Sequence, residues 1–316
     1  MTASSAWRRD PAWYTPSDLP SEIAAFATPM EGRLDVGAPG KIGLLELTLA
    51  PHDGVTRVES QYQRAPLHVY RPIYLDPRLP GMAFVFLQQS GDGLVQGDRY
   101  RIDIDCAAGS AVHVTTQAAT KVFAARQNFV TQLTNLSAGA DAVLEYLPDP
   151  VVPFRGSRLF QRTRAVAAPG STVVLGDVLL PGRVAHDEAH VYDVYWAETE
   201  FMRPDGTLLF SDVLRMHPAA GEDPRSIGFL GGHDVLATLY VVTSQVRAAA
   251  LVSILRSVLA CRTSVLAGAT ELPNGCGVAV RLLGECSAQV QAAMRAAWGA
   301  VRVELLDAPP PDLRKG

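Results

Sequence analysis

The sequence has few cysteines, no long apolar run and no block of like charge. Its four cysteines form neither a CxxC pair nor a dense framework, which argues against a disulfide-stapled secreted scaffold and fits a reducing compartment. The 28 basic and 32 acidic residues are interspersed, and no basic stretch is long enough to follow a phosphate backbone. Nucleic acid is therefore not an expected partner.

Signals for export or membrane insertion are also lacking. The twin arginines at 8–9 are followed by Asp10 and Pro11 and not by an apolar region, which argues against a twin-arginine signal. The most apolar stretch, 248–260, contains Arg256 and is too short to span a bilayer of ~30 Å. We predict no membrane segment and a cytoplasmic location.

What the sequence does contain is a long series of strand patterns. Between residues 41 and 240, alternating segments are separated by short turns rich in Gly, Pro and Asp. In Arg99–Cys106 apolar and charged residues alternate cleanly, and 111–117 and Leu208–Met216 show the same period of two. These patterns predict a mainly β protein.

The last quarter has a different pattern. Apolar residues at helical spacing predict a helix over 243–261, and Pro273-Asn274-Gly275 predicts a hairpin. Ser287 resembles an N-cap for a second helix ending near Leu306. Because strands come first and helices last, we expect layered mixed sheets with β-helix-like stacking, a small helix–hairpin–helix portion and no βαβ winding.

This pattern divides the chain into four parts. Residues 1–40 are expected to form a flexible N-terminal arm, and 41–306 a single domain. That domain comprises a sheet body over 41–240 and the helix–hairpin–helix portion over 241–306. A proline-rich tail follows over 307–316.

Motifs of common enzyme classes are missing. The sequence has no GxxxxGK[ST] nucleotide loop, no GxSxG nucleophile elbow and no cysteine nucleophile signature. The glycine-rich stretch 91–97 precedes a predicted strand, whereas a phosphate-binding loop needs a helix N-terminus after it. We interpret 91–97 as a tight turn.

The best metal candidate is the segment 186–190. Read as a strand, it places His186, Glu188 and His190 on one face, although the outer two would lie ~13 Å apart at ~3.3 Å per residue. A solvated strand face and a metal contact both remain open. If these three residues bind a metal ion, the protein could be a zinc or nickel hydrolase.

Glu145 is a carboxylate in an otherwise apolar strand pattern. Burial of a carboxylate is costly unless it is paired or binds a cation. It is therefore either half of a structural ion pair or part of a polar path through the core. His113, Thr115 and Gln117 share a face of a neighbouring predicted strand, which is either a polar outer face or part of such a path.

Three stretches in this order resemble a known family, the urease accessory protein D family (UreD, also called UreH). They are 93–99 (GLVQGDR), 115–123 (TTQAATKVF) and 144–150 (LEYLPDP). The resemblance runs from about residue 41 to the C-terminus. Asp92 and Gln96 stand where the family usually has glycine, and Asp187 replaces the glycine expected before Glu188.

The resemblance implies a non-enzymatic scaffold in urease maturation. It implies a hetero-oligomeric complex with apo-urease and the accessory proteins UreF and UreG, GTP being bound by UreG. It also implies no tightly bound cofactor, only Ni²⁺ in transit along an internal polar path. The motif positions expected to line that path are Asp98, Thr115, Thr116, Glu145 and Glu188. Structural roles are implied for Gly93, Gly97, Lys121, Arg158 and Arg183.

A plain interaction module without a metal role is a further alternative. Tyr192, Tyr195, Trp196 and Phe201 crowd one region of the sequence. Such aromatic clusters either anchor an interface or form part of a core.

Overall fold

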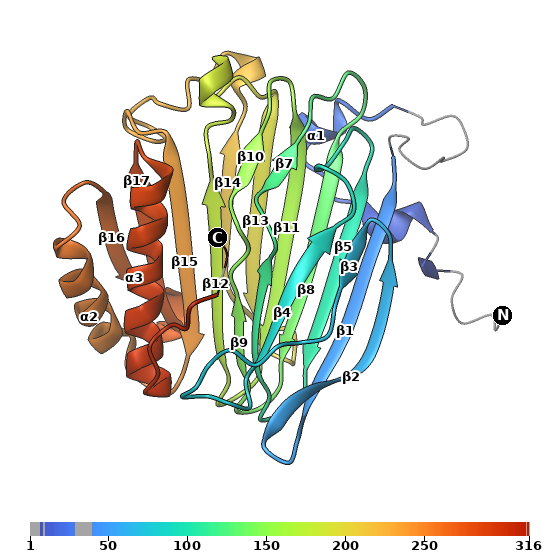
Figure 1. Cartoon of the computed structure of the whole chain (residues 1–316). Coiled ribbons are helices and arrows are strands. Elements are labelled where there is room, and N and C mark those ends of the chain that lie inside the picture. Colours follow the sequence, from blue (N-terminus) through green and yellow to red (C-terminus); the bar gives the residue numbers. More distant parts are fainter. Residues whose placement is uncertain (1–6, 9, 29–39, 314, 316) are drawn as a thin grey trace.

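The structure is a computed structural model that describes residues 7–8, 10–28, 40–313 and 315. Two large β-sheets packed face to face form the body of this described part (Figure 1). Their inner faces enclose one apolar core, to which both sheets contribute. The predicted fold class, mainly β with β-helix-like stacking, is confirmed.

The first sheet has the order β14-β13-β11-β8-β5-β1-β2 in its described part. Its central strands run parallel, and β2 and β14 close its edges as antiparallel hairpin partners. The strands are β1 (Ile42–His52), β2 (Val55–Arg64), β5 (Arg99–Cys106), β8 (Val130–Ala138), β11 (Arg158–Ala167), β13 (Val194–Met202) and β14 (Leu208–Met216).

The second sheet has the order β16-β17-β15-β12-β9-β6-β4-β3, with β7 and β10 as a side branch beside β12. Its strands are β3 (Leu67–Val69), β4 (Ala83–Gln89), β6 (Ala111–Thr116), β7 (Thr120–Val122), β9 (Val143–Tyr146), β10 (Val151–Pro153), β12 (Thr172–Leu179), β15 (Val235–Thr243), β16 (Leu266–Glu271) and β17 (Gly277–Gly284).

The chain builds both sheets by crossing between them. In the second sheet β4, β6, β9 and β12 are parallel neighbours, and between them the chain visits β5, β8 and β11 of the first sheet. Parallel neighbours need a crossover connection, and here the opposite sheet supplies it in place of a helix. The expected absence of βαβ winding therefore holds for the described strands.

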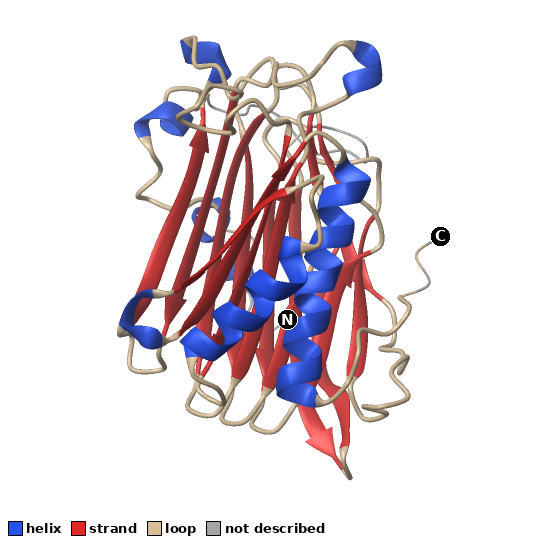
Figure 2. Cartoon of the chain, turned by 90° about the vertical axis from the view of Figure 1, so that its left-hand side faces the viewer, coloured by secondary structure: helices blue, strands red, loops and turns tan. Residues whose placement is uncertain are grey.

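Two helices cover the outer face of the second sheet (Figure 2). They are α2 (Ala248–Ala260) and α3 (Ser287–Leu306), and the predicted hairpin β16–β17 lies between them in sequence. The first predicted helix began too early, because Thr243 still belongs to strand β15. Ser287 is not the N-cap but the first helical residue, since Cys286 has the extended backbone of a cap. None of the described helices is both long enough and apolar enough to cross a membrane.

The described part of the N-terminal segment packs on the outer face of the first sheet. It forms η2 (Pro11–Tyr14) and α1 (Ser21–Ala24), and both Tyr14 and Ile23 are fully buried. The hydroxyl of Thr131 on β8 donates to the carbonyl of Tyr14 at 2.8 Å. Residues 10–28 are thus not the loosely attached arm that was expected, and 29–39 lie outside the described residues. The remaining short 3-10 helices are η3 (Val184–His186), η4 (Pro218–Ala220) and η5 (Pro273–Gly275).

Candidate functional site

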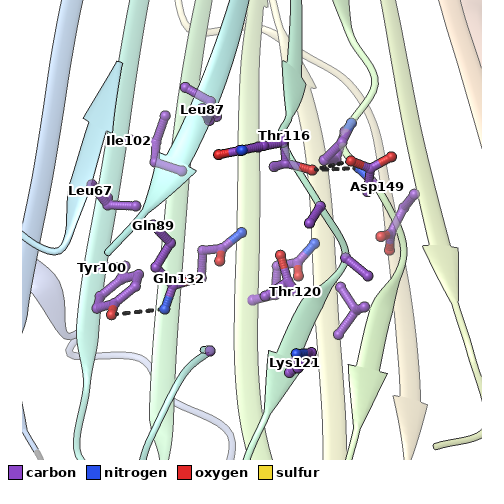
Figure 3. Close-up of a pocket in the computed structure, with 18 of the residues that line it drawn as sticks. Leu67, Leu87, Gln89, Tyr100, Ile102, Thr116, Thr120, Lys121, Gln132 and Asp149 are labelled. Carbon is purple, nitrogen blue, oxygen red and sulfur yellow. Dashed lines mark hydrogen bonds between the residues drawn. The ribbon is translucent and has the colours of Figure 1, made fainter. Parts of the chain in front are cut away.

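A cavity of about 240 Å³ lies between the two sheets, large enough to hold several water molecules (Figure 3). One wall comes from strands of the first sheet and the other from β4, β6, β9 and β12. Its lining is unusually polar for a sheet interior. Its polar lining residues include Gln89, Thr116, Gln132, Asp149, Gln161 and Asp177.

Strand register gathers several of these side chains into rows. Tyr100 pairs with Gln132, and Gln132 pairs with Gln161, across three parallel strands. Thr163 pairs with Thr199 one step further along. Because in-register parallel strands bring equivalent positions side by side, inward-pointing amides and hydroxyls become polar rows along the cavity wall.

Asp177 is the carboxylate that faces this cavity from β12. It accepts a hydrogen bond from the hydroxyl of Tyr195 at 3.3 Å, and the side chain of Gln161 also bonds to it. In the described part of the chain no cationic side chain forms an ion pair with it. Burial raises the pKa of Asp177, and a carboxylate that is desolvated but not neutralised favours binding a cation.

The three stretches that carry the family resemblance all contribute residues to the lining of this cavity. Gly91, Asp92 and Gly93 line it from the first stretch and its flank, the segment 116–121 from the second, and Tyr146, Pro148 and Asp149 from the third. The contact is close: the amide of Leu94 donates to the carbonyl of Lys121 at 2.8 Å. Lys121 itself is one of the lining residues labelled in Figure 3.

Gly93 and Gly97 shape this turn. A Cβ on Gly93 would lie 2.4 Å from the carbonyl oxygen of Lys121, which excludes a side chain there. Gly97 has φ +80°, which favours glycine. The stretch 91–97 is thus the tight turn that the sequence predicts, and Gln96 accepts hydrogen bonds from the backbone amides of Arg126 and Gln127.

The residues expected to line a path do not come together. Of the five, only Thr116 lines the cavity, where its hydroxyl donates to Asp149 at 3.1 Å. Thr115 donates to the carbonyl of Leu147 at 2.6 Å. Asp98 accepts hydrogen bonds from the amides of Lys41 and Val95, and so fixes the chain entering β5, while burial raises its pKa.

Glu145 lies on the opposite face of the second sheet, under α3, and is fully buried. It accepts hydrogen bonds from His113 Nδ1 at 2.8 Å, Trp298 Nε1 at 3.0 Å and Arg302 Nη1 at 2.9 Å. Arg302 also pairs with the buried Asp76. Burial alone would raise the pKa of Glu145, but the hydrogen bond and charge of His113, together with Arg302 and Trp298, lower it. The geometry is that of the structural ion pair considered from the sequence.

Glu188 is held by arginines. Arg183 binds both of its carboxylate oxygens, at 2.8 and 2.6 Å, and the amide of Arg155 lies at 3.4 Å. The hydrogen bond from Arg183 lowers the pKa of Glu188 to about 2. Arg158 similarly pairs with Asp193 at 2.7 Å. Arg158 and Arg183 therefore stabilise neighbouring turns.

The interpretation of 186–190 as a strand is wrong. His186 ends the short helix η3, and positive φ values at Asp187 and His190 turn the chain, so the two histidines do not share a strand face. His190 Nε2 lies 3.1 Å from Asp234, and burial lowers its pKa. Among the residues described, no group of three or more His, Cys, Asp or Glu is arranged to hold a metal ion.

The aromatic cluster belongs mostly to the core. Tyr192, Tyr195 and Phe201 are buried, and only Trp196 is partly exposed. Its indole donates to Glu198 at 2.8 Å. The interface interpretation therefore loses three of its four anchors.

Sequence analysis missed the cavity carboxylate and the glutamines. Asp177 sits in an apolar run, and Gln132 and Gln161 occupy strands whose alternation does not say which face is inside. The one available signal was the two-residue period of a strand, which places every second side chain on the same face as these polar residues.

Comparisons with known proteins agree with the motifs. A family model described as "UreD urease accessory protein" matches residues 41–315. A "Urease accessory protein UreD 2" of Streptomyces griseus is 43% identical over 298 residues, covering 93% of this chain and 100% of that protein. Proteins named "Urease accessory protein UreD" from Haloarcula marismortui and Cenarchaeum symbiosum are 40% and 34% identical, covering 92% and 90% of this chain and 96% and 99% of theirs.

Proposed function

This chain belongs to the UreD family of urease accessory proteins, and on that premise we propose that it conducts Ni²⁺ through the inter-sheet cavity to a docked apo-urease. In this proposal it acts in the cytoplasm as a scaffold that binds apo-urease together with UreF and UreG. The family name supports the urease maturation role; the partners and the nickel path are our inference. The observation that carries it is that three family stretches converge on one polar cavity, whose carboxylate Asp177 has no ion-pair partner among the described residues.

The chemistry of the lining suits a transported ion better than a resident one. Divalent metals of borderline softness bind carboxylate, imidazole and water ligands. Asp177 offers one carboxylate, and the amides and hydroxyls around it are neutral and weak ligands. A site of this kind holds a hydrated cation without trapping it, because a closed four-ligand shell is not available. Weak binding of this kind lets the ion leave again, as its transfer to apo-urease requires.

We propose that the chain itself catalyses no reaction and holds no permanent cofactor, with GTP hydrolysis left to UreG. The hydrolase alternative gains no support from the geometry. Glu188 is bound by Arg183, and His190 is engaged with Asp234. A docking module without a metal role is the remaining competitor, and the following experiment separates the two.

The test is activation of apo-urease at limiting Ni²⁺, reconstituted with UreF, UreG, GTP and either wild-type chain or Asp177→Asn. We expect the variant to lower the activation rate about tenfold, the lower end of the usual effect of disturbing a metal environment. Co-purification of the complex should be unchanged, because Asp177 is internal. The outcome that contradicts conduction is full activation by Asp177→Asn at every nickel concentration.

Asp105→Asn is the matched control. Asp105 is exposed on β5, outside the cavity lining, so the same loss of charge occurs without touching the path. An equal loss of activation in both variants would favour a docking or folding effect over conduction.

A further inference from the structure

The C-terminal tail folds back from α3 across the outer face of the second sheet. Asp307 takes a left-handed conformation that ends the helix, and the carbonyl of Pro311 accepts a hydrogen bond from Arg295 at 2.9 Å. Leu313 packs against the apolar cluster beneath the helices. Figure 1 shows the chain leaving the end of α3 and passing in front of the second sheet. The tail is therefore directed towards the strand ends that border the cavity.

Lys315 reaches those strand ends. Its ammonium lies 2.8 Å from Asp149 Oδ2 and 2.7 Å from the hydroxyl oxygen of Thr115. It also lies above the ring of Phe86, with 5.9 Å between Nζ and the ring centroid. The Lys315 side chain is only 24% exposed. Desolvation lowers the pKa of Lys315, and Asp149 opposes that shift. The partly desolvated ammonium of Lys315 thus lies against oxygen atoms of Asp149 and Thr115.

Asp149 connects the binding position of Lys315 to the cavity. It belongs to the segment between β9 and β10 where the sheet is interrupted, and it lines the cavity together with Thr116. Thr116 and Asp149 hold each other through two hydrogen bonds, at 2.8 and 3.1 Å. The carboxylate oxygen that binds Thr116 also binds Lys315. One carboxylate therefore serves both the cavity lining and the tail.

We propose that Lys315 is a tethered cation that gates this side of the cavity. Its ammonium occupies the position on Asp149 that a divalent cation would take, and a metal ion binds there only after the tail has moved away. The proposal rests on the cation-conducting function proposed above and adds a regulation to it. A partner that pulls the tail off the sheet would open the path.

Competition between two cations for one carboxylate gives a direct test. The full-length chain is titrated with Ni²⁺ by calorimetry at low salt, as wild type and as Lys315→Gln. Removing a charge at hydrogen-bond distance from the carboxylate is expected to raise the nickel association constant about tenfold. Adding Asp149→Asn to Lys315→Gln should abolish the gain. Arg262→Gln, which removes an exposed charge from the turn after α2, serves as the control that leaves affinity unchanged.

Equal nickel affinity of wild type and Lys315→Gln, including no binding by either, overturns the gate. So does a gain that persists when Asp149→Asn is added. Failure of the gate is distinguishable from failure of the conduction proposal by the Asp177→Asn arm. If Asp177→Asn impairs nickel-limited activation while Lys315→Gln binds nickel as the wild type does, the path stands and only its gating is wrong.

Discussion

Glu145 and Asp177 are two carboxylates on adjacent strands of one sheet, and they point in opposite directions. Glu145 faces α3 and is surrounded by Arg302, His113 and the Trp298 indole. Asp177 faces the cavity and has only hydroxyl and amide partners in the described part of the chain. The pKa is lowered in the first case and raised in the second. The two carboxylates therefore differ not in being shielded from solvent but in whether a positive charge compensates them.

The largest effect expected from this comparison is on stability at Glu145. Removing one member of a buried ion cluster leaves the others without compensation, which costs roughly 3–5 kcal/mol. Glu145→Ala should lower the free energy of unfolding by that amount, measured by urea denaturation. A stability within experimental error of wild type would show that the cluster does not anchor α3, and the contrast with Asp177 would then disappear.

A smaller effect of opposite sign is expected at Asp177. A buried charge whose hydrogen bonds do not neutralise it destabilises the folded state, so Asp177→Asn should raise the free energy of unfolding by about 1 kcal/mol at pH 7. The same denaturation measurement checks this. Destabilisation by Asp177→Asn would mean that the surrounding groups do offset the cost of burying the Asp177 charge.

The gain at Asp177 should depend on pH. Because burial places the folded pKa of Asp177 above its unfolded value, the folded state binds the proton more tightly. The stability of wild type therefore falls as pH rises from the ordinary aspartate pKa of about 3.9 towards the raised value. Asparagine does not titrate, so the stabilities of the two proteins should differ less at low pH than at pH 7.

Local structure was largely predictable from the sequence. The strands Arg99–Cys106 and Leu208–Met216 have the predicted bounds, because periodicity and turn residues act over short distances. The last helix ends at Leu306 as predicted but begins at Ser287, the residue that was expected to cap it. The turn at 186–190 was missed, although Asp187 and His190, which take positive φ, are of residue types enriched in that conformation.

The site was less predictable, because it depends on which strands become neighbours. Glu145 stood out as a lone carboxylate, yet its partner Arg302 lies 157 residues further along the chain. Asp177 follows Val173, Val174 and Leu175, so its segment resembled any buried strand. Only the alternation of the chain between two sheets places Asp177 opposite Gln161 and makes that face a cavity wall.

The most direct test of the central claim is anomalous scattering at the nickel edge from crystals of the full-length chain soaked in Ni²⁺. The account predicts a peak inside the inter-sheet cavity beside Asp177 that is lost in Asp177→Asn, and no peak at Glu145. Nickel bound only on the outer surface or within the Glu145 cluster would contradict it.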